Sequence, residues 1–139
     1  MAVLTACAAR TIKPRDVRTL GGGTDEVQAL VRLALMLDAA GDRRADTLYS
    51  PEALIVGNAR VRLAAPRFAG ITGTQGRVAI TASSATVEGR VAWVLLDYQW
   101  LNPAERRTEV GRATVICEWR GNSWKIVHAH SSQPLPWEP

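Results

Sequence analysis

Two stretches near the end of the chain decide its fold: Gly111 to Trp119, GRATVICEW, and Ser123 to Ser132, SWKIVHAHSS. Both are rich in β-branched and aromatic residues, which favour strands. Arg120 to Ser123 form a polar turn between them. The two stretches are therefore predicted to be a pair of long antiparallel strands.

Upstream of this pair, the spacing of apolar residues changes once from helical to extended. Thr24 is expected to cap a helix that ends at Gly41, and Asp42 a second, shorter helix running towards Tyr49. From Ala53 onward the pattern predicts strands at 53–56, 59–63, 78–87 and 90–101. Helices first and strands afterwards predict an α+β domain, with N-terminal helices packed on a curved, mostly antiparallel sheet.

Size and composition limit the classes of protein that the chain can be. Its 139 residues suffice for one domain, and no apolar run approaches the roughly 18 residues of a membrane-spanning helix. The net charge is +4, but the arginines are scattered along the chain. A nucleic-acid surface would gather them on one element, so no nucleic-acid partner is expected.

The first and last residues are expected to lie outside the domain. Residues 1–23 are predicted to be a signal-peptide remnant or tether, 24–132 the domain and 133–139 a C-terminal tail. Leu4 to Cys7, LTAC, has the form of a bacterial lipobox, although only six residues precede Cys7, too few for a signal peptide. Two interpretations stay open: a trimmed precursor with a lipid anchor at Cys7 in the cell envelope or periplasm, or an accidental match in a cytoplasmic protein.

The order of elements, the stretch from Leu48 to Ala53 and the closing stretch from Trp124 to Ser131 together resemble the nuclear-transport-factor-2-like superfamily. The resemblance covers 24–132. It is closest to the SnoaL-like and ketosteroid-isomerase-like bacterial members and to the association domain of calcium/calmodulin-dependent kinase. It implies a cone-shaped α+β barrel around a pocket, whose outer sheet face commonly forms a homodimer. It does not identify a function, because the superfamily includes isomerases, dehydratases, cyclases, epoxide hydrolases and assembly modules.

Alternation along the strands, together with an ungapped comparison with the kinase domain, assigns residues to the two faces of the sheet. The pocket face is predicted to be an apolar wall with few polar groups, formed by Trp93, Leu95, Asp97, Gln99, Ala113, Val115, Cys117, Val127, Ala129 and Ser131. The opposite face is predicted to be too apolar to stay in water and hence to form the homodimer. It would carry Val94, Leu96, Tyr98, Trp100, Arg112, Thr114, Ile116, Glu118, Trp124, Ile126, His128 and His130.

This assignment predicts a site for a small apolar ligand. Tyr49 and Trp93 would form its packing walls, and the other contacts would come from Asp97, Gln99, Val115, Cys117 and Ser131. Asp97 is the ionisable group of that face besides the thiol, so it is the candidate general base of a lyase, isomerase or cyclase. The alternative is an Asp97 that lies at a rim, solvated or bonded to a backbone amide.

Other chemistries lack their residues. The tyrosine and aspartate of the ketosteroid isomerases fall near Ala34 and Gly57, and the pocket arginines of the kinase domain also have no counterpart. His128 and His130 lack a third ligand, so no metal and no cofactor are expected. The sequence thus predicts a small-molecule-binding domain of unknown specific role, with an enzyme that uses Asp97, or a lipid-anchored assembly module without catalysis, as alternatives.

Overall fold

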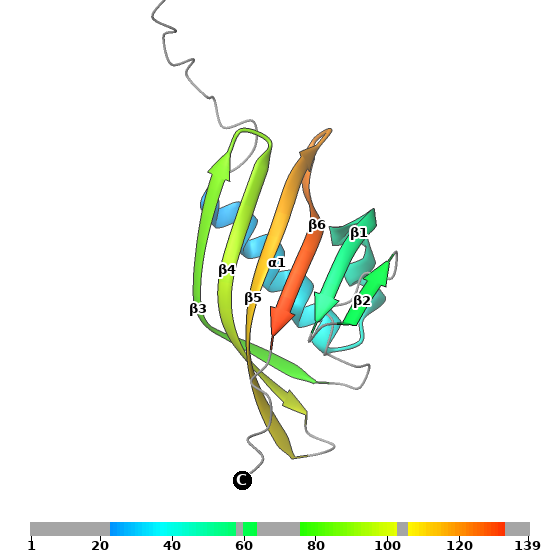
Figure 1. Cartoon of the computed structure of the whole chain (residues 1–139), viewed down its shortest axis with the longest axis vertical. Coiled ribbons are helices and arrows are strands. Elements are labelled where there is room, and N and C mark those ends of the chain that lie inside the picture. The colour runs from blue at the N-terminus through cyan, green and yellow to red at the C-terminus, as the bar shows by residue number, and fades with distance from the viewer. Residues whose placement is uncertain (1–22, 58–59, 64–75, 103–105, 133–139) are drawn as a thin grey trace, which may run out of the picture.

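The computed structural model describes residues 23–57, 60–63, 76–102 and 106–132, which form one helix packed on a six-stranded sheet (Figure 1). The elements in chain order are α1 (Thr24–Ala39), the 3-10 helix η1 (Arg43–Leu48), β1 (Tyr49–Gly57), β2 (Arg60–Leu63), β3 (Arg77–Glu88), β4 (Val91–Asn102), β5 (Arg107–Arg120) and β6 (Ser123–Ser132). The predicted α+β class with a curved sheet is confirmed. The sheet stays open, with β2 and β3 at its edges.

Both helices begin and end near the predicted residues. Gly23, not Thr24, occupies the N-cap of α1, and Thr24 is the first helical residue. Gly41 has a φ of 69°, the left-handed conformation that suits glycine after a helix. The predicted second helix is a 3-10 helix, and Asp42 caps it because its carboxylate accepts a hydrogen bond of 2.9 Å from the backbone N–H of Arg44.

The strands occur in the spatial order β2-β1-β6-β5-β4-β3. The predicted hairpin of β1 and β2 is confirmed by antiparallel pairing from Leu54–Leu63 to Gly57–Arg60, and residues 58–59 lie outside the described part. β3 to β6 form an antiparallel meander. β1 pairs with β6 in parallel, so the strand furthest along the chain occupies a central place in the sheet.

Three register shifts occur in the sheet, and one of them lies between Tyr49 and Leu54, where β1 pairs with β6. In β3 the register shifts between Ile80 and Ala82, and Figure 1 shows the nearby ends of β3, β4 and β5 bending across the molecule. In β6 the register shifts between Ile126 and His128, so that Ile116 pairs with His128 and the next residue, Cys117, with Ile126. This last shift puts one extra residue into β6 and reverses which face the following side chains take.

The core lies between α1 and the sheet. From the helix it receives Val27, Val31, Ala34 and Leu35, at the spacing of one helical face. The largest contributions from the strands are aromatic: Tyr49, Tyr98, Trp100 and Trp124, each at most 4% exposed. Gly111 makes room for the Tyr98 ring, because a Cβ there would lie 2.3 Å from its Cζ. Large aromatic side chains therefore contribute much of the described core.

Candidate functional site

The strand register decides which residues face α1. Val94 pairs with Val115, Ala92 with Cys117 and Leu96 with Ala113, and all six side chains are buried. These pairs lie on the face that α1 covers, here called the inner face; the other side is the outer face. Ala113, Val115, Cys117, Ala129 and Ser131 lie on the inner face, as predicted.

For β4 the predicted faces are wrong. Trp93, Leu95, Asp97 and Gln99 were assigned inward, but they alternate with the buried Val94, Leu96, Tyr98 and Trp100 and so lie on the outer face. Leu95 is 50% exposed and Gln99 is exposed. In β6, Trp124 and Ile126 were assigned outward but are buried, and the register shift at Val127 separates them from the outward His128 and His130.

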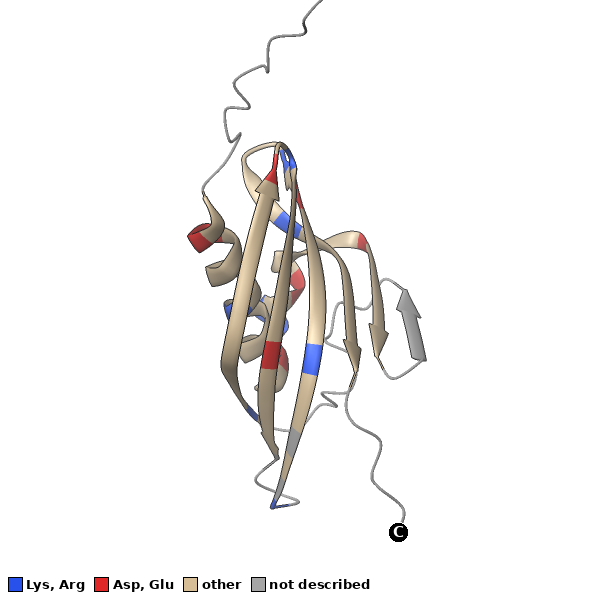
Figure 2. Ribbon diagram, turned by 60° about the vertical axis from the view of Figure 1, so that its left-hand side comes forward, with Lys and Arg blue, Asp and Glu red and all other residues tan. Residues whose placement is uncertain are grey.

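Asp97 forms an ion pair on the outer face. Its two carboxylate oxygens accept hydrogen bonds of 2.7 Å from Nε and 3.1 Å from Nη2 of Arg112, the residue that pairs with it across β4 and β5. Figure 2 shows an acidic and a basic position side by side on two neighbouring strands of the sheet. The Arg112 guanidinium holds the pKa of Asp97 below its usual value. The prediction that Asp97 points into the pocket is therefore wrong. The prediction that Asp97 is a general base depended on burial in an apolar pocket, and Asp97 does not have that environment.

Two buried polar side chains, Tyr49 and Asp38, meet at the end of α1. Tyr49 and Asp38 are 4% and 3% exposed, and the Tyr49 hydroxyl donates a hydrogen bond of 2.5 Å to Oδ2 of Asp38. Burial, and then the Asp38 carboxylate, raise the pKa of Tyr49 well above its usual range. Burial also raises the pKa of the Cys117 thiol to about 12. Both groups stay protonated at neutral pH, and neither is poised as a nucleophile or base.

The predicted ligand residues thus lie on two sides of one sheet. Tyr49, Val115, Cys117 and Ser131 are buried inside, whereas Asp97, Trp93 and Gln99 lie outside. The structure does not bring the seven together, and contact between any of them and a ligand stays a prediction. Sequence analysis missed the buried Asp38; its place within an apolar helical stripe was the available signal.

Surface hollows among the described residues adjoin the Asp97–Arg112 pair. One, of about 370 Å³, also contains Ser83, Ser84 and Leu95, and another, of about 500 Å³, contains Thr81, Gln99, Val110 and Ser132. Neither includes any of the four predicted ligand residues that lie inside. These hollows are consequently a different place from the predicted cavity.

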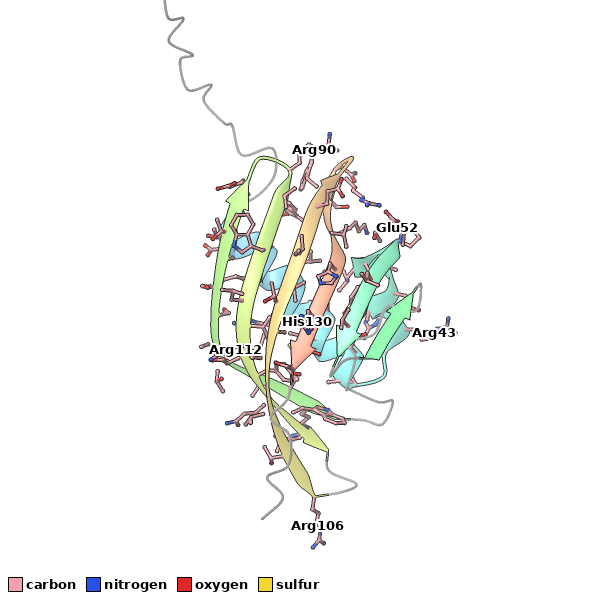
Figure 3. All side chains as sticks on the ribbon, viewed as in Figure 1. Arg43, Glu52, Arg90, Arg106, Arg112 and His130 are labelled. Atoms are coloured by element: carbon pink, nitrogen blue, oxygen red, sulfur yellow. The ribbon has the colours of Figure 1, made fainter. Side chains whose placement is uncertain are left out.

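A second group of charges lies at the opposite end of the outer face. Arg120 forms ion pairs with Glu52 of β1 and, at 3.2 Å, with Glu118 of β5. Arg120 holds the pKa of Glu52 below its usual value. Figure 3 shows Arg112 and Glu52 well apart, with His130 between them in this view. Charged pairs therefore border the outer face at two ends, and its middle carries apolar residues and histidines.

Metal-ligating side chains do not gather in groups of three or more anywhere in the part of the chain that the structure describes. No helix among the described residues is long and apolar enough to cross a membrane.

Comparison with solved structures shows the same fold in several proteins. An NTF2-like protein of unknown function from Pseudomonas putida KT2440 superposes with a TM-score of 0.67 at 15% identity, covering 83% of this chain and 89% of its own. An NTF2-like superfamily protein from Salmonella enterica serovar Typhimurium gives 0.65 at 19% identity, covering 81% and 91%. The CaMKII hub of S. rosetta gives 0.64 at 17% identity, covering 82% and 98%. At these identities the likeness shows the fold alone.

Sequence comparison gives the family. None of the curated proteins compared with this chain matches it. Residues 29–136, most of the chain, match the SnoaL-like domain. The chain shares the fold of the NTF2-like proteins and belongs to the SnoaL-like domain family.

Proposed function

We propose that this domain acts in assembly and that two copies associate through the outer faces of their sheets. The observation that carries the proposal is a band of half-buried and exposed side chains, most of them apolar, in the middle of that face. The band consists of two rows that cross four strands in register: Trp93, Ile116, His128 and Leu54, and beside them Leu95, Thr114, His130 and Val56. We call these eight residues the outer band.

The outer band is too apolar to be explained as an ordinary solvated surface. Leu95 is half exposed, and Trp93, Ile116, Leu54 and Val56 are only partly covered by their own chain. A contiguous patch of this kind that is rimmed by polar groups is typical of a protein interface. The two groups of ion pairs supply such a rim.

A second copy of the chain is the partner that we propose for this surface. Two sheets pack face to face about 10 Å apart when their facing side chains interlock, and a two-fold contact uses the same patch on both partners. A stable interface buries about 800 Å² on each partner, and we expect the charged rim to contribute to that area together with the two rows. The similarity of the fold to the S. rosetta CaMKII hub supports an assembly role.

Leu95→Glu tests the proposal, because it places a charge in the middle of the outer band. The wild-type chain is expected to sediment as a dimer, and Leu95→Glu as a folded monomer. Leu33→Glu is the matched control: Leu33 on α1 is 45% exposed but lies outside the outer band, so this variant should remain dimeric. A wild-type chain that is monomeric at the highest attainable concentration would exclude the proposal.

Binding of a small ligand inside the domain is a second candidate, and one observation favours it. The indole Nε1 atoms of Trp100 and Trp124 are buried without a hydrogen-bond partner among the described residues, and both rings belong to the core that also contains Tyr49. A buried donor without a partner costs about 1–3 kcal/mol, and a ligand acceptor would relieve that cost. Native mass spectrometry of protein purified gently from its own cells tests this candidate, since a bound molecule would add a discrete mass.

Location in the cell envelope is a further proposal, supported by the lipobox-like sequence that ends at Cys7. Labelled fatty acid supplied to the native cells should attach to the wild-type chain and not to Cys7→Ser. Equal labelling of the two chains, or none of either, would remove the support.

A further inference from the structure

The middle of the outer band holds both histidines of the chain, in adjacent rows of β6. His128 lies in register between Ile116 and Leu54, and His130 between Thr114 and Val56. Figure 3 shows His130 on the sheet near the middle of the molecule. Each imidazole therefore has uncharged neighbours on both adjacent strands.

The other charged side chains described on this face lie outside the two rows. On β4 and β5, Asp97 and Arg112 pair with each other one row away. At the other end, Glu118 and Glu52 pair with Arg120, and Nζ of Lys125 donates a hydrogen bond of 2.5 Å to the carbonyl oxygen of Thr47.

The two edge strands, β2 and β3, place no charged residue in register with the two rows at their described positions. On β3, Arg77 and Glu88 lie at the two ends of the strand, and the positions in register with the rows are Thr86 and Ser84. On β2, the positions in register are Leu63 and Val61. Among the described side chains of the two rows, the ionisable ones are thus the two imidazoles.

We propose that protonation of His128 and His130 separates the two copies, so that the assembly is a pH-sensitive one. This inference rests on the proposed association through the outer band. A neutral imidazole is tolerated in an apolar contact, whereas an imidazolium loses hydration there and has no carboxylate in its own rows to compensate. A two-fold contact also brings the histidines of both copies into one interface, where their positive charges repel each other.

The direction of the pH dependence follows from proton counting. The dimer holds fewer protons on these imidazoles than two separate chains do, so association strengthens as pH rises and weakens as pH falls. Histidine gains its proton between about pH 5 and pH 8. For each imidazole that has to be neutral in the contact, the association constant falls about tenfold one pH unit below the usual histidine titration point. Asp97 and Glu52 stay ionised in this range, because their arginines lower their pKa values.

Sedimentation velocity at pH 7.5 and pH 5.5, at one ionic strength, tests the inference, with circular dichroism to confirm that the chain is folded at both. The wild-type chain should be dimeric at pH 7.5 and mostly monomeric at pH 5.5. The double variant His128→Gln, His130→Gln should be dimeric at both. Arg77→Gln removes a charge from the exposed end of β3 and should keep the wild-type pH dependence.

The outcomes separate this inference from the proposed function. A wild-type dimer at both pH values overturns the pH dependence and leaves the association standing, whereas a monomer at both overturns the two together. A double variant that still dissociates at pH 5.5 shows that other groups are responsible and overturns the inference. Where the double variant does not associate at pH 7.5, each single glutamine variant should show a shallower pH dependence than the wild type, and an equally steep one overturns the inference.

Discussion

Two adjacent leucines of β4 provide the sharpest test of the face assignment. Leu95 is 50% exposed on the outer face, and Leu96 is 3% exposed in the core. Replacing either one by Glu makes the same chemical change one residue apart on the same strand. The register predicts opposite consequences, because Leu96 pairs with the buried Ala113 and Leu95 with the half-buried Thr114.

The expected magnitudes differ widely. Removing a buried leucine side chain costs about 2–5 kcal/mol, and a buried carboxylate without a cation adds several kcal/mol or takes up a proton to avoid that cost. The sum reaches the whole stability of a typical domain, about 5–15 kcal/mol, so Leu96→Glu should be unfolded or insoluble. Leu95→Glu changes a solvated position, and its free energy of unfolding should stay within about 1 kcal/mol of the wild type when both are measured as monomers.

Urea unfolding followed by circular dichroism measures both variants. Leu95→Gln and Leu96→Gln serve as uncharged controls. Leu96→Gln should again be less stable than Leu95→Gln, but the difference in their free energies of unfolding should be smaller than for the two glutamate variants. A folded, soluble Leu96→Glu together with an unfolded Leu95→Glu would show that the β4 register is one residue away from that described, and the outer band would then have to be redrawn.

Three further predictions follow from the interior and from the Asp97–Arg112 pair. Gly111→Ala should destabilise the domain by about 1–3 kcal/mol in urea unfolding, because the added Cβ overlaps the Tyr98 ring. The same substitution in a Tyr98→Leu chain should cost less, and equal costs in the two chains would contradict the overlap. In a Cys7→Ser chain, which keeps Cys117 as its thiol, the folded protein should not react with a thiol reagent at pH 8, because burial raises the pKa of Cys117 to about 12, and it should react rapidly once urea exposes the side chain; rapid labelling of the folded Cys7→Ser chain would contradict the burial of Cys117. Because Arg112 lowers the pKa of Asp97, the ion pair stabilises the folded chain at pH values above the ordinary aspartate pKa, and this stabilisation is lost as pH falls below about 4. The free energy of unfolding of Asp97→Asn should therefore fall less between pH 7 and pH 3 than that of the wild type. An equal fall in both chains would contradict the pairing.

Local patterns in the sequence were sufficient for most elements. The turn around Gly121, the helix end at Gly41 and the strand Ser123–Ser132 were predicted at or close to their observed residues. These features depend on neighbouring residues only: a glycine with positive φ, a run of β-branched and aromatic residues, a polar turn. The parallel pairing of β1 with β6 joins segments far apart in the chain, and local patterns do not encode it.

The faces of β4 were the main error, and the sequence held a usable signal. One alternating set of this strand, Val94, Leu96, Tyr98 and Trp100, is wholly apolar, whereas the other includes Asp97 and Gln99. The wholly apolar set is the one that packs under α1. In β6 no such signal exists, because the register shift beside Val127 depends on how β5 and β6 pair and not on a glycine or proline. The predicted ligand site combined residues from both sides of the sheet because its residues were selected by their assigned face, and the faces of β4 were assigned wrongly.

The central position of β6 also bears on how the chain is made in the cell. Because β6 joins β1 on one side and β5 on the other, the β1–β2 hairpin and the β3–β5 meander have no strand contact with each other until β6 is in place. During synthesis the ribosome releases β6 after every other strand, so the nascent chain exposes two incomplete half-sheets with open edges. Chaperones should therefore bind the newly made chain until β6 joins the two half-sheets, and their binding should then fall abruptly.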